Sequence, residues 1–308
     1  MASKSKFQII ILGNSAAIPT KTRKLSSQIV IINNEYFLVD CGEGTQMQLI
    51  IHGIKYQKIN NIFISHLHGD HFFGLIGLIS TYHLLGREKP LNIYAPPQLE
   101  KLIRIQLEVA HTILSYKLIF HYLESNHSTL IFENTAVSVF SFPMTHRVPT
   151  YGFRFQEKPK PRNIKKTFID EYNPSIEAMK SIKSGCDYTD GAGKLIKNKD
   201  ITISPSDPRS YAFCSDTRYD ESIINYVMNA NLIYHEATFD NSMQEKAYEK
   251  FHSTSGDAAK IAKKARVGSL LLGHFSARNE DLSIIKQEAE EVFKPVSISE
   301  EGEIYNVE

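Results

Sequence analysis

The stretch His66-Leu67-His68-Gly69-Asp70-His71 places four potential metal ligands within six residues. It follows directly on Asn61–Ser65, whose apolar character is typical of a buried strand. On a regular strand or helix the four side chains would point in different directions, but on a loop leaving a strand they can surround one or two cations. Imidazole nitrogens favour zinc-type ions, and a carboxylate can be shared between ions. The stretch therefore predicts a metal site in preference to a polar surface loop.

Six adjacent residues cannot complete the coordination of two ions, so further ligands must come from elsewhere in the chain. Three candidates follow predicted strands, and ligands in α/β proteins gather beyond one end of a sheet. They are His146 after Val137–Phe142, Asp216 after Tyr211–Ser215 and His274 after Ser269–Leu272. Taken singly, each is more often structural, and Asp216 before Thr217 could belong to a turn or a helix cap. Taken together with residues 66–71, they predict a two-metal site.

Short strands and helices alternate in two series of similar size, before and after the middle of the chain. The first series contains the predicted strands Phe7–Leu12, Gln28–Ile32, Tyr36–Val39 and Asn61–Ser65 and the helix Leu75–Leu85. The second contains the strands Tyr211–Ser215, Leu232–His235 and Ser269–Leu272 and the helices Ser222–Met228, Ser255–Arg266 and Leu282–Phe293. This order predicts a layered α/β protein with its sheets inside and its helices outside.

Residues 157–204 interrupt this pattern and are rich in Lys, Pro, Asp, Ser and Gly. Apart from a short helix near Ile176–Ile182, we expect little regular structure there, which is unusual inside a compact domain and indicates a functional or mobile segment. The subsegment 157–166 concentrates positive charge on Lys158, Lys160 and Arg162, and its prolines keep it extended. It can follow RNA phosphates, although a solvated loop is an equally good interpretation of the charge alone.

The composition describes a globular protein. The chain has 308 residues, 35 Lys+Arg against 34 Asp+Glu, and 42% hydrophobic residues, which excludes a disordered chain. No apolar run approaches the roughly 18–20 residues of a membrane span, and we expect neither membrane association nor export. The three cysteines are scattered without a C-x-x-C pair, which fits the reducing cytoplasm. Because the net charge is only +1, nucleic-acid binding would depend on local basic patches.

Four further motifs, together with residues 66–71, carry a resemblance to a known family. They are Asp40-Cys41-Gly42-Glu43-Gly44-Thr45-Gln46, His235-Glu236-Ala237-Thr238, His252-Ser253-Thr254 and Gly273-His274-Phe275-Ser276-Ala277-Arg278. In these the chain resembles the metallo-β-lactamase fold superfamily and, within it, the ribonuclease Z (tRNA 3′-endonuclease) family. The resemblance extends from about Phe7 to beyond Ala277. It implies an α/β fold, a four-layer αβ/βα sandwich formed as one domain by residues 1–308, with residues 157–204 inserted as a tRNA-binding arm.

The resemblance also implies the activity and its metal ligands. The family removes the 3′ trailer from precursor tRNA by phosphodiester hydrolysis, leaving a 3′-OH on the tRNA and a 5′-phosphate on the trailer. Two Zn²⁺ per subunit are implied, with Mn²⁺ or another divalent ion as the alternative. The first ion would be held by His66, His68, His146 and Asp216, and the second by Asp70, His71, Asp216 and His274. Asp70 would also accept the proton of the attacking water.

By the same resemblance, Glu236 would orient His252, which would protonate the departing 3′ oxygen. From the residues alone, His252 is better interpreted as the flank of a helix beginning near Ser255, capped by Ser253 or Thr254. His235 follows a strand and would orient a metal ligand. Asp40 either hydrogen-bonds a ligating imidazole or only forms a tight turn.

The resemblance finally implies a cytoplasmic homodimer in which the arm of one subunit grips the tRNA for the active site of the other. Lys158, Lys160, Arg162 and Arg278 would contact the RNA. The Gly-Pro-rich arm motif of many bacterial members is not evident; Ser184–Tyr188 and Gly191–Gly193 occupy that region.

The same residues have to be compared with other functions of this fold and with a non-catalytic one. A small-phosphodiester hydrolase of the same fold is the main alternative, whereas an exported lactamase would need a signal peptide and a thioesterase has no need of a basic insert. A non-catalytic RNA-binding relative would have lost a metal ligand, and all seven are present.

Overall fold

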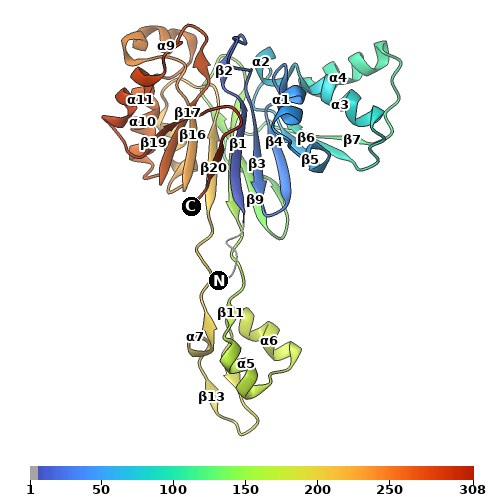
Figure 1. Ribbon diagram of the computed structural model, residues 1–308, viewed down its shortest axis with the longest axis vertical. Coiled ribbons are helices and arrows are strands. Elements are labelled where there is room, and N and C mark those ends of the chain that lie inside the picture. Colours follow the sequence, from blue (N-terminus) through green and yellow to red (C-terminus); the bar gives the residue numbers. More distant parts are fainter. Residues whose placement is uncertain (1–5) are drawn as a thin grey trace. The chain divides into compact units, whose positions relative to one another are not determined.

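The computed structural model describes residues 6–308, and the chain divides into two compact units (Figure 1). The larger unit contains the chain up to Gln156 together with Arg209–Glu308, and the smaller unit is Glu157–Pro208. Within the described residues, no helix is both long and apolar enough to cross a membrane.

The larger unit is built on two seven-stranded sheets, with the strand orders β20-β1-β3-β4-β5-β6-β7 and β19-β17-β16-β15-β10-β9-β8. The strands of the first are β1 Phe7–Gly13, β3 Ser27–Ile32, β4 Glu35–Val39, β5 Ile59–Phe63, β6 Leu91–Ala95, β7 Leu118–Tyr122 and β20 Ile304–Asn306. Those of the second are β8 Thr129–Glu133, β9 Val137–Met144, β10 Thr150–Glu157, β15 Ser210–Cys214, β16 Leu232–Glu236, β17 Ser269–Gly273 and β19 Val296–Ile298. The two-residue strands β2 Ser15–Ala16 and β18 Phe275–Ser276 pair with each other.

The helices lie on the outer faces of the sheets (Figure 1). Those of the first half are α1 Thr45–Ile51, α2 Gly69–Phe72, α3 Leu75–Leu84 and α4 Gln98–Val109. Those of the second half are α8 Ile224–Val227, α9 Gln244–Lys250, α10 Ser255–Lys264 and α11 Ser283–Glu290, and short 3₁₀ turns cover Tyr56–Lys58, Glu221–Ile223 and Asn241–Met243.

Successive side chains along a strand point alternately to the core between the two sheets and to the outer helices, which gives the layered arrangement. Phe37 and Val39 of β4 lie in the cluster between the sheets, where Phe153 and Phe213 of the second sheet meet them, while Leu38 faces the helices of the first half. This is the period of two expected for a strand covered on both faces. A third cluster packs α10 and α11 against the second sheet. The predicted αβ/βα sandwich is therefore confirmed.

Both sheets are parallel in the part that carries the functional loops. Strands β4, β5, β6 and β7 run parallel through helical crossovers, and so do β15, β16, β17 and β19. The carboxyl ends of parallel strands share one edge of a sheet, so the residues that follow β5, β15, β16 and β17 are brought to comparable positions.

The smaller unit has more regular structure than the sequence predicts. The expected helix is present as α6 Ile176–Lys183, and it is joined by α5 Lys166–Tyr172 and α7 Asn198–Ile201. Four two-residue strands pair as β11 Asn163–Ile164 with β14 Thr202–Ile203 and β12 Tyr188–Thr189 with β13 Leu195–Ile196. Phe168, Ile182 and Ile201 form a small core of its own. Elements this short leave no detectable periodicity in a sequence, which is why the expectation of little structure was wrong.

Candidate metal centre and catalytic residues

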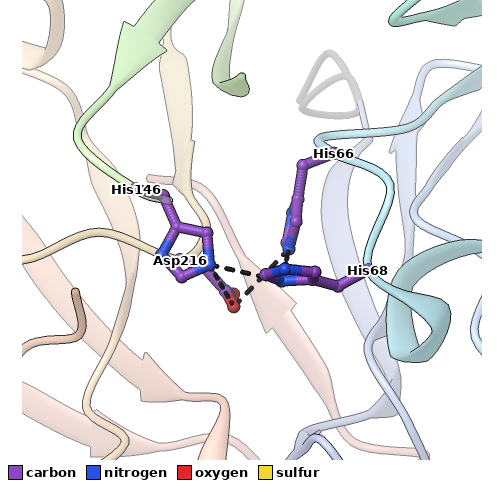
Figure 2. Close-up of side chains that lie close together, drawn as sticks. All are labelled: His66, His68, His146 and Asp216. Atoms are coloured by element: carbon purple, nitrogen blue, oxygen red, sulfur yellow. Dashed lines mark hydrogen bonds and ion pairs between the residues drawn. The ribbon is translucent and has the colours of Figure 1, made fainter. Parts of the chain in front are cut away.

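The first cluster joins His66, His68, His146 and Asp216, which come from three distant parts of the chain (Figure 2). His68 Nδ1 lies 3.1 Å from His66 Nε2 and 3.3 Å from His146 Nε2. Asp216 Oδ2 lies 3.6 Å from His66 Nε2 and 3.8 Å from His146 Nε2. Ligand atoms about 2.0–2.1 Å from a tetrahedral ion stand roughly 3.3–3.4 Å apart. The four atoms therefore have the chemistry and the spacing to hold a divalent cation.

The second cluster joins Asp70, His71 and His274 to the other oxygen of the same Asp216. The Nε2 atoms of His71 and His274 are 3.3 Å apart, and each is 3.5 Å from Asp70 Oδ2. Asp216 Oδ1 lies 3.3 Å from His71 Nε2 and 3.2 Å from His274 Nε2. This spacing also fits a divalent cation. One carboxylate thus contributes an oxygen to each cluster, as a ligand bridging two metal ions would.

The outer ring nitrogens of the candidate ligand histidines are fixed by hydrogen bonds. His146 Nδ1 donates to the Phe251 carbonyl oxygen at 2.9 Å, so its Nε2 faces the cluster without a proton. His274 Nδ1 lies 3.1 Å from the Thr238 hydroxyl, and His71 Nδ1 donates to Asp40 Oδ2 at 2.7 Å. Such partners set the tautomer and the orientation of metal-ligating imidazoles.

Asp40 also anchors the loop that carries the ligands. Its carboxylate accepts hydrogen bonds from the backbone N–H and the hydroxyl of Ser65, at 2.8 and 2.9 Å, in addition to the bond from His71. Of the two interpretations of Asp40, the hydrogen bond to an imidazole is the one found. Asp40 (φ 55°) and His274 (φ 56°) both have left-handed backbone conformations, which non-glycine residues adopt at an energetic cost and typically at functional sites.

The electrostatics of the buried clusters favour cation binding. Burial lowers the pKa of His66 well below its ordinary value, so the ring is neutral. Burial raises the pKa of Asp216, but the neighbouring rings of His274, His71 and His66 outweigh it and hold this pKa well below the usual range. Burial lowers the pKa of His71, but Asp216, Asp70 and Asp40 raise it well above its ordinary value. A cation bound at His71 would therefore replace a proton.

Glu236, the last residue of β16, is buried and connects His252 to the metal ligands. Its Oε1 accepts hydrogen bonds from His252 Nδ1 and from the Thr217 backbone N–H, both at 2.8 Å. Its Oε2 accepts from the Thr238 hydroxyl at 2.6 Å, and that hydroxyl lies beside His274. Burial lowers the pKa of His252, but Glu236, Asp216 and Asp70 raise it to about 9 overall. His252 is thus protonated at neutral pH.

The two interpretations of His252 are compatible, because Thr254, two residues later, caps α10. Its side chain accepts from the Asp257 backbone N–H, and Asp257 reciprocates in a capping box. His235 does not do what we expected of it. Its Nδ1 donates to the Glu236 carbonyl oxygen, and its buried Nε2 has no hydrogen-bond partner among the described residues, so it orients no metal ligand. Neighbours on a strand point to opposite faces, so only one of the two can face His252, and it is Glu236, as the resemblance implies.

A cavity of about 710 Å³ opens on the candidate metal ligands. His68, Asp70, Asp216, His252 and His274 line it, and so does the exposed Arg278. Other residues also line it, among them Phe73, Arg147, Lys246 and Lys250. Phe73 and Arg147 lie within two residues of predicted ligands, but no spacing in the sequence marks these four as functional.

The remaining predicted RNA contacts, Lys158, Lys160 and Arg162, belong to the smaller unit. Lys160 Nζ lies 3.8 Å from the Glu157 carboxylate. Arg162 is half-buried, and its Nε donates to the Thr202 hydroxyl at 2.7 Å, so it also holds β11 and β14 together.

The chain is similar to known proteins over nearly its whole length. It is 44% identical to "Ribonuclease Z" of Phocaeicola vulgatus, over 96% of each chain, and 40% identical to that of Cytophaga hutchinsonii, over 98% of this chain and 96% of the relative. Among solved structures, the short form of human tRNase Z superposes with a TM-score of 0.71 at 28% identity, over 98% of this chain and 99% of that one.

Two further similarities concern the fold or one part of the chain. The metallo-β-lactamase fold protein YhfI from Bacillus subtilis has a TM-score of 0.70 at 19% identity, over 98% of this chain and 99% of that one, which shows the fold alone. The family model described as "Anti-Pycsar protein Apyc1" matches residues 7–159. The extent and the identity of the matches to curated relatives show that the chain belongs to the ribonuclease Z family.

Proposed function

We propose that this protein is a metal-dependent endoribonuclease that removes the 3′ trailer from precursor tRNA. The observation that carries the proposal is the pair of ligand clusters joined through Asp216 and placed next to the protonated His252. Such a site can cleave a phosphodiester and protonate its leaving group. The similarity to proteins named ribonuclease Z and to human tRNase Z identifies the substrate class.

The roles of the metal ligands follow from the two clusters. We assign His66, His68, His146 and Asp216 to one ion, and Asp70, His71, Asp216 and His274 to the other. Five imidazoles and two carboxylates suit Zn²⁺, with Mn²⁺ as the alternative. When bound, two such cations activate water near neutral pH and neutralise charge on the phosphoryl oxygens.

Asp70 is placed to accept the proton from the attacking water. Burial raises its pKa, but His71 and His274 lower it far more, so the carboxylate is ionised. Its Oδ2 accepts a hydrogen bond from the Ala17 backbone N–H at 2.8 Å, which fixes its orientation at the floor of the cavity. His252 lies near Asp216 and His274 and donates its proton to the departing 3′ oxygen, and Glu236 holds its ring in place.

The smaller unit is the proposed tRNA-binding arm inserted into a single catalytic domain. Between residues 157 and 208 there are ten Lys and Arg against eight Asp and Glu, whereas the rest of the chain has 25 against 26. The excess positive charge therefore lies in the arm, where it favours phosphate binding. We propose Lys158, Lys160 and Arg162 of the arm, and Arg278 at the cavity, as RNA contacts.

We further propose a homodimer acting in the cytoplasm. On α1, the apolar side chains of Met47, Ile50 and Ile51 are exposed, and so are Leu84 and Leu85 at the end of α3. The two helices are connected, since the Gln46 amide donates to the Thr81 hydroxyl at 2.8 Å. Exposed apolar surface of this kind is typical of subunit contacts. A second subunit would supply the arm that serves the first active site.

A small-phosphodiester hydrolase of the same fold is the alternative, and one experiment separates the two. Incubation with an end-labelled precursor tRNA and mapping of both product ends should show a tRNA ending in 3′-OH and a trailer beginning with 5′-phosphate. Hydrolysis of small diesters without any cleavage of the precursor would refute the proposal.

A further inference from the structure

The cavity at the candidate metal centre has an apolar wall, to which neither the two ligand clusters nor the pair of His252 and Glu236 contributes. Phe73 and Ile18 line the cavity, and their side chains are 63% and 60% exposed. Large apolar side chains beside a polar catalytic centre are exposed to water at a cost. A ligand that covers them would remove that cost.

Phe73 is held in place against the ligand loop. It follows α2 directly, and its backbone N–H donates to the Gly69 carbonyl oxygen at 3.0 Å. The ring lies over Gly69 so closely that a Cβ at that position would stand 2.2 Å from a ring atom. Gly69 separates the ligands His68 and Asp70. The aromatic surface is therefore fixed next to two of the metal ligands while most of it stays exposed.

Ile18 comes from another part of the chain and is placed beside the ligand loop by its neighbour Ala17. The neighbouring Ala17 has a left-handed backbone conformation, with φ 60°, and its N–H donates to Asp70 Oδ2 at 2.8 Å. Both exposed apolar groups are thus anchored through residues in contact with the loop of Asp70, the proposed proton acceptor.

Basic side chains line the cavity as well. Lys246 and Lys250 of α9 and Arg147 also line the cavity, and α9 ends just before His252. Because His252 protonates the 3′ oxygen, the last nucleotide of the tRNA belongs on the side of His252. In an in-line displacement the water attacks opposite this oxygen. The first trailer nucleotide keeps the phosphate through its 5′ oxygen, which is equatorial in such a displacement and lies along neither the attacking nor the leaving direction. Its base is therefore free to lie away from His252, toward the ligand loop and Phe73.

We propose that Phe73 stacks on the base of the first trailer nucleotide, with Ile18 extending the apolar surface. Precursor trailers differ in sequence, so a site that accepts them cannot depend on the hydrogen-bonding edge of one base. Stacking on an aromatic ring tolerates every base, because each has a π-face. The inference rests on the proposed function and specifies how the same site positions its substrate.

The test compares Phe73→Ala with the wild type on three precursor tRNAs: an unmodified one, one with an abasic first trailer nucleotide, and one with an abasic last tRNA nucleotide. Loss of one base stack costs roughly 5- to 150-fold in binding. On the unmodified precursor we expect Phe73→Ala to raise KM by about tenfold or more and to change kcat less than twofold. Phe73→Trp should retain the wild-type KM, as should Ile284→Ala, a control at an exposed apolar residue outside the lining of the cavity and outside the proposed subunit contact.

The abasic precursors make the assignment specific. On the precursor without a base on the first trailer nucleotide, wild type and Phe73→Ala should have the same KM. On the precursor without a base on the last tRNA nucleotide, the KM of Phe73→Ala should remain higher than that of the wild type. An increase in KM for Phe73→Ala that is equal on all three substrates would overturn the inference, and so would an increase that disappears when the last tRNA nucleotide is abasic. Loss of bound metal from Phe73→Ala, measured by elemental analysis, would overturn it as well. If the wild type cleaves none of the precursors, the proposed function fails instead.

Discussion

The substitution Glu236→Gln tests whether one buried carboxylate controls the proton on His252. In the wild type, Glu236 Oε1 accepts from His252 Nδ1 at 2.8 Å, and Glu236 is the largest of the contributions that raise the pKa of His252 to about 9. Glutamine keeps the size of the side chain and removes its charge. We therefore expect the pKa of His252 to fall towards its ordinary value of 6.5.

The loss of cleavage activity in Glu236→Gln should be larger at high pH than at low pH. A complete fall of the pKa from about 9 to 6.5 is the upper limit, because Asp216 and Asp70 still raise it, and it corresponds to roughly 3.4 kcal/mol less stabilisation of the imidazolium. At pH 8 the protonated fraction of His252 would drop from about 90% to about 3%, and at pH 6 from nearly 100% to about 75%. Because the protonated ring is the acid, Glu236→Gln should cost up to about 30-fold in cleavage at pH 8 but less than twofold at pH 6.

The assay is kcat/KM for precursor tRNA cleavage between pH 5.5 and 10, measured for wild type and variant at one metal concentration. The wild-type rate should decline as the pH rises through about 9, and the variant should decline at a lower pH. Glu221→Gln, which changes an exposed carboxylate paired with Lys264, is the matched control and should leave the profile unchanged. If Glu236→Gln lowers kcat/KM by the same factor at pH 6 and pH 8, the assignment of His252 as the acid held protonated by Glu236 is refuted.

Three further outcomes follow from the structure. Elemental analysis of the wild type should find about two divalent cations per chain, and Asp216→Ala should bind fewer because this carboxylate belongs to both clusters; an unchanged content would contradict the shared role. Asp70→Asn should abolish cleavage of precursor tRNA while leaving its binding, measured by filter retention, within a few-fold of the wild type; cleavage at the wild-type rate would exclude Asp70 as the proton acceptor. Deletion of residues 158–200 should reduce precursor cleavage far more than hydrolysis of a small phosphodiester, and equal losses on both substrates would argue against an RNA-binding arm.

Much of the candidate site could be predicted because most of its candidate ligands come directly after a strand. Residues 66–71 follow β5, and Asp216 and His274 follow β15 and β17 within a few residues. A strand end is recognisable from a short apolar run, and ends of parallel strands converge in space, so a local pattern here carries three-dimensional information. The two-residue strands of the arm could not be predicted from the sequence, because none is longer than one period of the alternation along a strand.

Other features depended on contacts between residues far apart in the chain. The contact of Asp40 with His71 and the place of the Thr238 hydroxyl between Glu236 and His274 are known only from the packed sheets. Each of these contacts is a hydrogen bond of 2.6–3.1 Å. Hydrogen bonds require placement to a fraction of an ångström, which composition and periodicity do not supply.

The sequence by itself determined the layered α/β architecture, the seven metal ligands to consider and the family, because these depend on residue types in local order. The tertiary structure alone decided which atoms of those ligands face each other, which proton each histidine carries and where the cavity exposes Phe73. Those properties arise from the packing of two sheets face to face, which brings together side chains separated by up to two hundred residues, as His71 and His274 are.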